Sequence, residues 1–211
     1  MIDVYIAELP SVELNEPLSC EERQKGIDKI KNERARREKY YVWRLLEYAI
    51  KNSLGADASR LYFTRGENGR WICNDVEFSL SHSGNALAVA LLNNKSKSNT
   101  VGVDVESVNG RSVERLADYM LTPSEREELC SVEDSMRQEW LIGKWCQKEA
   151  IFKSQNKESF VPRKIEVAEF FSDVRKIELN GEAYMLAVAS VCSESVNVID
   201  GLRFDKNQIL C

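Results

Sequence analysis

The sequence predicts an α+β protein made of two similar halves, each a helix packed on an antiparallel sheet. The first observation is a repeat, because Leu-Ala-Val-Ala occurs at residues 87–90 and again at 186–189. The second is a pair of helix-like stretches, residues 37–51 and 137–153, which precede the two copies at nearly one spacing. Order and spacing favour a duplication over a chance match of alanine-valine strands. We therefore expect halves related by a pseudo-twofold axis, with a cleft between them that suits a small molecule.

The elements of the first half are read from periodicity and turn signals. Residues 14–26 predict a loop or short helix, and residues 27–54 predict one long helix with a basic first part. Short strands are expected at 60–63 and 76–80, with Asn68-Gly69 as a hairpin turn between them.

In the second half, Thr122-Pro123-Ser124-Glu125 begins a helix, since proline is favoured in a first turn and acids follow it. Strands are expected over residues 164–171, 174–179 and 184–191. The join is expected near residues 108–112, so that residues 1–108 form the N-terminal half and residues 109–211 the C-terminal half.

Composition excludes several classes of protein. The 211 residues carry a formal charge of −5, which argues against general nucleic-acid binding. Apolar runs stay shorter than a membrane span, and the N-terminus lacks a signal-peptide pattern, so we expect a cytoplasmic protein. The six cysteines form no C-x-x-C pair, which argues against a zinc site, and a reducing compartment argues against disulfides.

Residues 101–106, VGVDVE, alternate strictly and predict a strand with its valines in the core. Gly102, Asp104 and Glu106 then share the other face, where glycine leaves space for a ligand to approach the backbone. Two neighbouring carboxylates repel unless a positive group lies between them, and the residues that follow provide none. Mg²⁺ suits such a pair, and Mn²⁺ takes the same oxygen ligands. A solvated strand edge is the alternative.

Residues 145–153, WCQKEAIFK, predict a helix that places Glu149 on an apolar stripe with Ile142, Trp145 and Phe152. Lys153 follows one turn later, and an exposed Glu–Lys pair is the alternative. A half-buried carboxylate needs a partner. If Glu149 meets Asp104 and Glu106 across the cleft, three carboxylates surround one metal ion.

The one histidine of the chain, His82, lies in FSLSHSG at residues 78–84. On its residues alone, a histidine hydrogen-bonded in the core is the leading interpretation. Together, residues 79–84, 102–106 and 145–153 resemble the three signature stretches of the 4′-phosphopantetheinyl transferases. The order of the stretches matches, and the likeness runs from the first long helix to the last strand. The better match is the surfactin-synthetase-activating type, a monomer of two similar halves with its active site in the cleft between them.

The resemblance implies a reaction. The family transfers the phosphopantetheine arm of coenzyme A to a serine of an apo acyl or peptidyl carrier protein and releases adenosine 3′,5′-bisphosphate. Asp104, Glu106 and Glu149 match the metal ligands, and Mg²⁺ is the expected ion. Glu149 is also the expected base for the carrier serine, and Lys153 is expected on the phosphates.

The remaining site residues also come from the resemblance. Ser81 and His82 match the family's phosphate-contacting pair, so that a single imidazole is enough. Among the basic residues expected at the 3′-phosphate (Arg34, Arg36, Arg37 and Lys39), Arg37 is favoured and Arg36 is second, although a solvated helix face explains any one of them equally well. Gly69-Arg70 resembles the turn beside the adenine, where Trp71 replaces the usual proline, and Cys146 replaces a threonine or serine as a small packing residue.

Two other functions compete with the transferase. A non-catalytic protein that binds coenzyme A or a nucleotide could keep the fold, and a hydrolase could use Mg²⁺ on a diphosphate. The presence of all four residues Asp104, Glu106, Glu149 and Lys153 weighs against the first.

Overall fold

The computed structural model describes residues 1–11, 16–66, 69–93, 99–109, 113–155, 157–205 and 208–210. Its helices are α1 (Glu21–Asp28), α2 (Glu33–Leu54), α3 (Val113–Met120), α4 (Pro123–Cys130) and α5 (Arg137–Gln155). Its strands are β1 (Ile2–Glu8), β2 (Phe63–Arg65), β3 (Trp71–Cys73), β4 (Glu77–Ser83), β5 (Ala86–Leu92), β6 (Val101–Ser107), β7 (Phe171–Leu179), β8 (Glu182–Ser190), β9 (Val196–Asp205) and β10 (Gln208–Leu210). The expected α+β class is confirmed.

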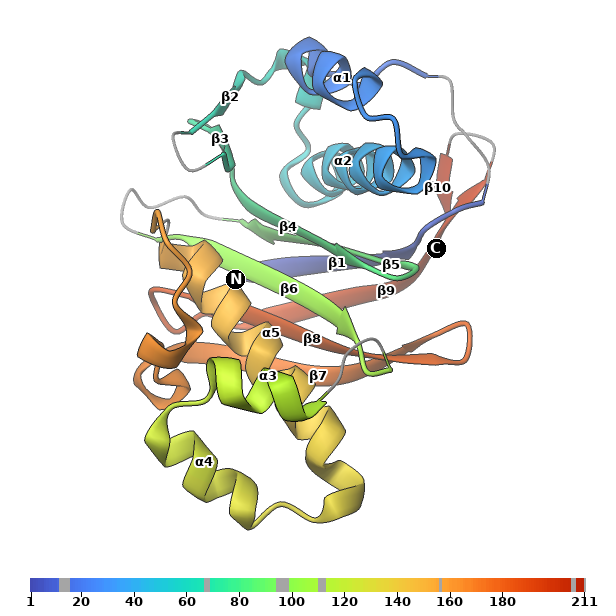
Figure 1. The fold of residues 1–211 in the computed structure, drawn as a ribbon. Helices are drawn as coiled ribbons and strands as arrows, with labels where there is room; N and C mark the ends of the chain where they lie inside the picture. Colours follow the sequence, from blue (N-terminus) through green and yellow to red (C-terminus); the bar gives the residue numbers. More distant parts are fainter. Residues whose placement is uncertain are drawn as a thin grey trace.

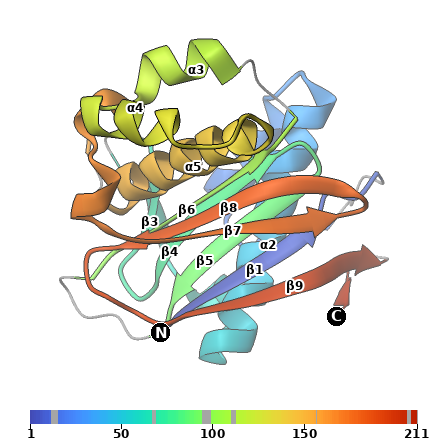
Figure 2. The same ribbon diagram turned by 90° about the horizontal axis from the view of Figure 1, so that it is seen from below.

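Two sheets pack face to face, and each carries helices on its outer face (Figures 1 and 2). The larger sheet has the strand order β10-β9-β1-β5-β4, and the smaller has β6-β8-β7. Neighbouring strands are antiparallel except β1 and β9, which run parallel. Helix α2 covers the larger sheet, α5 covers the smaller, and strands β2 and β3 form a separate hairpin.

Side-chain alternation builds the layers. In β5, Leu87, Val89 and Leu91 face α2, while the alanines between them face the smaller sheet. In β6, the three valines pack between the sheets as expected. The opposite face of β6, which carries the two acids, is therefore turned toward α5.

The two halves share an order of elements, β1-α2-β4-β5 and β6-α5-β7-β8, and their strands pair in the same way. The repeated tetrapeptides are one residue out of register, because Leu87 faces α2 whereas Leu186 faces the other sheet. Strand pairing also crosses the expected boundary, since β6 belongs to the smaller sheet and β9 to the larger. The pseudo-twofold axis and the division at residue 108 stay predictions.

Several expected elements differ from the structure. Residues 164–171 are not a strand, since two 3₁₀ turns, Pro162–Lys164 and Val167–Glu169, precede β7. The long helix is divided, because the Asn32 side chain accepts from the Ala35 amide and starts α2 anew. Strands β1 and β9 were not expected. Asn68 and residues 110–112, at the expected hairpin turn and join, lie outside the described residues.

None of the helices that the described residues form is long and apolar enough to cross a membrane.

Candidate functional site

The acidic face of β6 is closed by helix α5. Asp104 is only 5% exposed, and Glu106 is half-buried. A Cβ added at Gly102 would lie 1.9 Å from the Ala150 carbonyl oxygen in α5. The expectation that Gly102 leaves space for a ligand is therefore wrong. This glycine admits the backbone of α5, and the close approach brings the helix side chains onto the two acids.

Three serines of β4 hold β6 by their hydroxyl groups. The Oγ atoms of Ser79 and Ser81 accept from the amides of Val103 (3.0 Å) and Val105 (3.3 Å). Ser81 Oγ also donates to Asp104 Oδ1, and Ser83 Oγ donates to Glu106 Oε2, both over 2.7 Å. Alternate residues of a strand share one face, so the serine run of FSLSHSG is turned toward β6 and fixes both carboxylates. His82, between Ser81 and Ser83, is turned the other way.

Lys153 supplies a cation for Asp104, one of the two acids. Its ammonium group lies 2.8 Å from Asp104 Oδ1 and donates to the Val103 carbonyl oxygen over 3.0 Å. Burial lowers the pKa of Lys153, but Asp104 and Glu149 raise it more, so that the net shift is upward. Lys153 therefore stays charged at neutral pH. The alternative of an exposed Glu–Lys pair does not describe it, because its ammonium group is bound to β6.

Cys146 lies beside the same acids and is fully buried. Burial, together with the carboxylates of Asp104 and Glu106, raises the pKa of its thiol well above the usual range. The thiol is therefore protonated at neutral pH, and its Sγ lies 3.4 Å from the Met185 carbonyl oxygen. This environment is that of a packing residue rather than a nucleophile.

The three expected metal ligands lie around this cluster, but they do not form a ready-made cage. Among the residues that the structure describes, no group of three or more His, Cys, Asp or Glu side chains is gathered closely enough to hold a metal ion. One observation fits a cation nevertheless. Asp104 Oδ2 is buried without a hydrogen-bond partner, which leaves one carboxylate oxygen available as a ligand. The metal set of Asp104, Glu106 and Glu149 stays a prediction.

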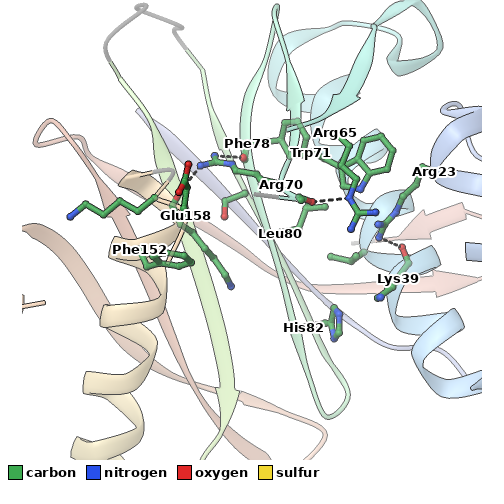
Figure 3. Close-up of a pocket in the computed structure, with 15 residues that line it drawn as sticks. Arg23, Lys39, Arg65, Arg70, Trp71, Phe78, Leu80, His82, Phe152 and Glu158 are labelled. Atoms are coloured by element: carbon green, nitrogen blue, oxygen red, sulfur yellow. Dashed lines mark hydrogen bonds between the residues drawn. The ribbon is translucent and has the colours of Figure 1, made fainter. Parts of the chain in front are cut away.

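A cavity of about 400 Å³ opens beside Lys153 (Figure 3). Its charged lining is mostly cationic, and includes Arg23, Lys39, Arg65, Arg70, Lys153 and Lys157. His82 and the acid Glu158 also line it. Four expected site residues therefore lie on it, namely Gly69, Arg70, His82 and Lys153. Ser81 does not line it. Arg36 and Arg37 do not line it either, and Arg37 Nη1 instead donates to the Ser11 carbonyl oxygen.

Arg23, Arg65 and Lys39 form the inner cationic wall of the cavity. Neither arginine was predicted from the sequence. The Arg23 guanidinium stacks over Trp43 and Trp71, at 5.2 and 5.8 Å from the ring centroids. Burial, followed by the charge of Arg65, lowers the pKa of Arg23 to about 10. No described acid forms a salt bridge with Arg23, Arg65 or Lys39, so this wall has positive charge to offer an anion.

Arg70 has a different environment, because protein groups surround its guanidinium. Nη2 donates to Glu77 Oε1 (2.7 Å) and to the carbonyl oxygens of Phe78 (2.9 Å) and Val101 (3.1 Å), and Nη1 donates to that of Lys153. Burial lowers the pKa of Arg70 despite the nearby Glu77. Arg70 therefore joins β4, β6 and the end of α5 at the edge of the cavity.

His82 also lines the cavity, and its Nδ1 lies 3.6 Å from Glu38 Oε2. Burial lowers the pKa of His82. Glu38 raises it, and the cations Lys153, Lys39 and Arg23 lower it, with a net shift downward. The imidazole of the empty site is therefore mainly neutral at pH 7. It lines a cavity instead of sitting in a core.

These features describe a cationic cavity beside a lysine that pairs with a buried carboxylate, which is an arrangement suited to a phosphate-bearing ligand. Comparison with known proteins agrees. Residues 100–203, which include β6 and α5, match the 4′-phosphopantetheinyl transferase superfamily. This region of the chain is therefore similar to that superfamily.

A Haemophilus influenzae protein provisionally named as a 4′-phosphopantetheinyl transferase is 30% identical over 115 residues. The aligned part covers 54% of this chain and 47% of that protein, so the match spans about half of either chain.

Proposed function

We propose that the protein transfers the 4′-phosphopantetheine group of coenzyme A to a serine of an apo acyl or peptidyl carrier protein. The other product is adenosine 3′,5′-bisphosphate. The observation that carries this proposal is that Lys153 contacts two features at once. One is a cavity whose inner cations have no described acidic partner, and the other is the buried carboxylate of Asp104. The match of residues 100–203 to the superfamily supports the same reaction.

In this proposal the cavity binds the nucleotide end of coenzyme A. Its volume is within the range of small-molecule sites. Arg23, Arg65 and Lys39 carry the uncompensated charge and would hold phosphate oxygens by charge-assisted hydrogen bonds. Trp71 offers an aromatic face beside them. Arg23 and Arg65 take the role that the resemblance assigned to Arg36 and Arg37, because they line the cavity.

Lys153 and His82 flank the position of the diphosphate. Lys153 reaches the cavity from α5 and His82 from β4, so that both can donate to the oxygens on which negative charge builds during phosphoryl transfer. Charge stabilised in this way on the departing bisphosphate lowers the barrier to breakage of the diphosphate bond.

Asp104, Glu106 and Glu149 would hold the Mg²⁺ ion, with Mn²⁺ as the other candidate. A bound divalent ion supplies charge neutralisation and orientation of the diphosphate. Asp104 Oδ2, buried without a partner, is the ligand that supports this role. Glu149, half-buried on the same helix as Lys153, would accept the proton of the carrier serine, directly or through a water.

One experiment separates this function from its two alternatives. The protein is incubated with coenzyme A, Mg²⁺ and an apo carrier protein, and the carrier is weighed by mass spectrometry while the bisphosphate is measured by chromatography. We expect the carrier to gain one phosphopantetheine and one bisphosphate to be released for each gain. Tight coenzyme A binding without any gain would indicate a non-catalytic binding protein. Bisphosphate released without carrier modification would indicate a hydrolase.

We also propose that the protein acts as a cytoplasmic monomer. Two similar halves in one chain would supply the cleft that smaller members of the family form between subunits. Which carrier is served is a question for the same assay, run with fatty-acid, polyketide and peptide carriers in parallel.

A further inference from the structure

The imidazole of His82 lies between the cavity and a carboxylate. His82 lines the cavity, whereas Glu38 does not. The distance of 3.6 Å between His82 Nδ1 and Glu38 Oε2 is too long for a hydrogen bond but short enough for an ion pair once the ring is protonated. Because Nδ1 is on the Glu38 side, Nε2 is the nitrogen left for a ligand.

Glu38 is itself held in place. Arg34 Nε lies 3.0 Å from Glu38 Oε1, and Arg34 Nη2 donates to the Gly84 carbonyl oxygen over 2.8 Å. Gly84 lies in the turn that follows β4, two residues after His82. The carboxylate is therefore tied both to its own helix and to the turn beside the imidazole, and its side chain is only 15% exposed.

The other charged groups that act on His82 are positive. They are Arg23 of α1, Lys39 of α2 and Lys153 of α5. Glu38 is the acid that opposes them at the ring, and Glu158 is a second acid on the cavity wall. In the empty cavity, the positive charge of a protonated imidazole is thus balanced by Glu38. A phosphate group that binds in the cavity would add a second negative charge beside the ring.

We propose that Glu38 is a positioning residue for His82, which directs Nε2 into the cavity and allows the imidazole to take up a proton when a phosphate group binds. The proton comes from solvent. In the imidazolium, Nε2–H donates to a phosphate oxygen and Nδ1–H faces Glu38. This inference deepens the proposed function and rests on it for the identity of the ligand.

The chain has a single histidine, so its NMR signals belong to His82 without ambiguity. In the free wild-type protein, nitrogen–proton correlation spectra should show the neutral ring protonated on Nδ1. Addition of coenzyme A, or of inorganic diphosphate as a simpler probe, should raise the pKa of His82. Calorimetry at pH 7 in buffers of different ionisation enthalpy should show proton uptake with binding.

The variant Glu38→Gln keeps the shape of the side chain and removes its charge. It should lower the pKa of His82 by roughly one unit in the free protein and reduce the proton uptake. Glu38→Asp keeps the charge and should give an intermediate pKa, which provides a second measurement if the glutamine variant folds poorly. The matched control is Glu47→Gln, since Glu47 is a half-buried acid of the same helix that pairs with Arg44 beside another cavity. It should leave His82 unchanged.

An unchanged His82 pKa in Glu38→Gln, or a wild-type neutral ring protonated on Nε2, would overturn the assignment of Glu38. The proposed function fails differently. If the NMR results hold but no carrier gains phosphopantetheine, the transferase is wrong while the Glu38–His82 pair stands.

Discussion

In the proposed function, Lys153 is the residue that takes part in both ligand binding and chemistry. Its ammonium group contacts Asp104 and the backbone of β6, and its side chain also lines the cationic cavity. In the empty site its positive charge compensates the buried carboxylate of Asp104, which would otherwise lack a counter-charge. With a diphosphate bound, the same ammonium group would lie within reach of both Asp104 and the diphosphate oxygens.

Replacement of Lys153 by Met should therefore reduce carrier modification by at least about 100-fold, because a preorganised donor to the developing charge is lost. Initial rates followed by mass spectrometry measure the effect. Lys144→Met is the control, since Lys144 lies on the same helix but pairs with Glu128. It should stay within about twofold of wild type. Near-normal turnover in Lys153→Met would remove Lys153 from the mechanism.

At the scale of elements, the contact between α5 and β6 determines the site. Gly102 is the residue that permits it, because an added Cβ would overlap the Ala150 carbonyl group and lie 2.7 Å from the Ser154 nitrogen. The lining atoms are helix backbone, which cannot move aside as a side chain end can.

We expect Gly102→Ala to lower the free energy of unfolding by about 3 kcal/mol or more, since it overpacks a rigid contact. Chemical denaturation measures this change. The control is Gly26→Ala in α1, where a Cβ meets nothing within 4 Å. Alanine there should stabilise the protein by about 0.5–1 kcal/mol. Equal stability of Gly102→Ala and wild type would show that α5 does not approach β6 this closely.

Helix α5 is fixed from its other side by a fully buried ion pair. Lys148 Nζ lies 2.7 Å from Glu125 Oε2, and both side chains are 0% exposed. Glu125 also accepts from the Thr122 amide in the capping box of α4, and Lys148 donates to the carbonyl oxygens of Pro162 and Ile165. One lysine thus joins α4, α5 and the 3₁₀ segment.

Lys148→Met should destabilise the protein by about 3–5 kcal/mol, because it leaves the Glu125 carboxylate buried and uncompensated. The double variant Lys148→Met with Glu125→Leu should recover part of that loss, since both charges are then removed. Thermal and denaturant unfolding of wild type, the single variants Lys148→Met and Glu125→Leu, and the double variant measures the coupling. A double variant that loses the sum of the two single effects would contradict a direct interaction.

Prediction from sequence succeeded where the pattern was local. The alternation of Val101–Glu106 was enough to place the valines between the sheets and the acids on the other face. The role of Gly102 was missed, because nothing in a strand pattern tells which helix will cross it. Arg23 was missed for a similar reason, since it comes to the cavity only through the stacking of Trp43 and Trp71 in three dimensions.

At the scale of the whole molecule, Asp3 joins the first and last large segments of the chain. Its carboxylate accepts from Ser53 of α2 (2.7 Å), from Asn93 after β5 (2.6 Å) and from Asn197 of β9 (3.0 Å). Burial raises the pKa of Asp3, but these hydrogen bonds lower it more, and the net shift is downward. The contribution of the ionised group to stability is therefore present above the unfolded pKa of about 3.9 and is lost as the pH falls through the folded value.

Asp3→Asn should be less stable than wild type at pH 7, and the difference should shrink as the pH falls below about 4. Unfolding free energies measured from pH 7 to pH 3 test this dependence. Asp75→Asn serves as the control, because Asp75 is exposed. A constant difference between Asp3→Asn and wild type across this range would contradict the account.

The parallel pairing of β1 with β9 could not be predicted from the sequence, for a physical reason. It joins residues almost 200 positions apart, and neither segment carries a signal that names its partner. The cavity could not be predicted for the same reason, since α1, α2, β4 and α5 contribute to it from distant parts of the chain. Local patterns predicted the individual motifs, and the packing of the two layers determines which of them meet.

The central claim is that Asp104, Glu106 and Glu149 act together on a diphosphate bound beside Lys153. The most direct measurement is the mass of an apo carrier protein after incubation with coenzyme A, Mg²⁺ and the triple variant Asp104→Asn, Glu106→Gln, Glu149→Gln. We predict no detectable gain of phosphopantetheine with this variant. Full modification is predicted with wild type and with the matched variant Glu127→Gln, Glu133→Gln, Asp134→Asn, whose acids are exposed. Carrier modification by the first variant at the wild-type rate would contradict the claim.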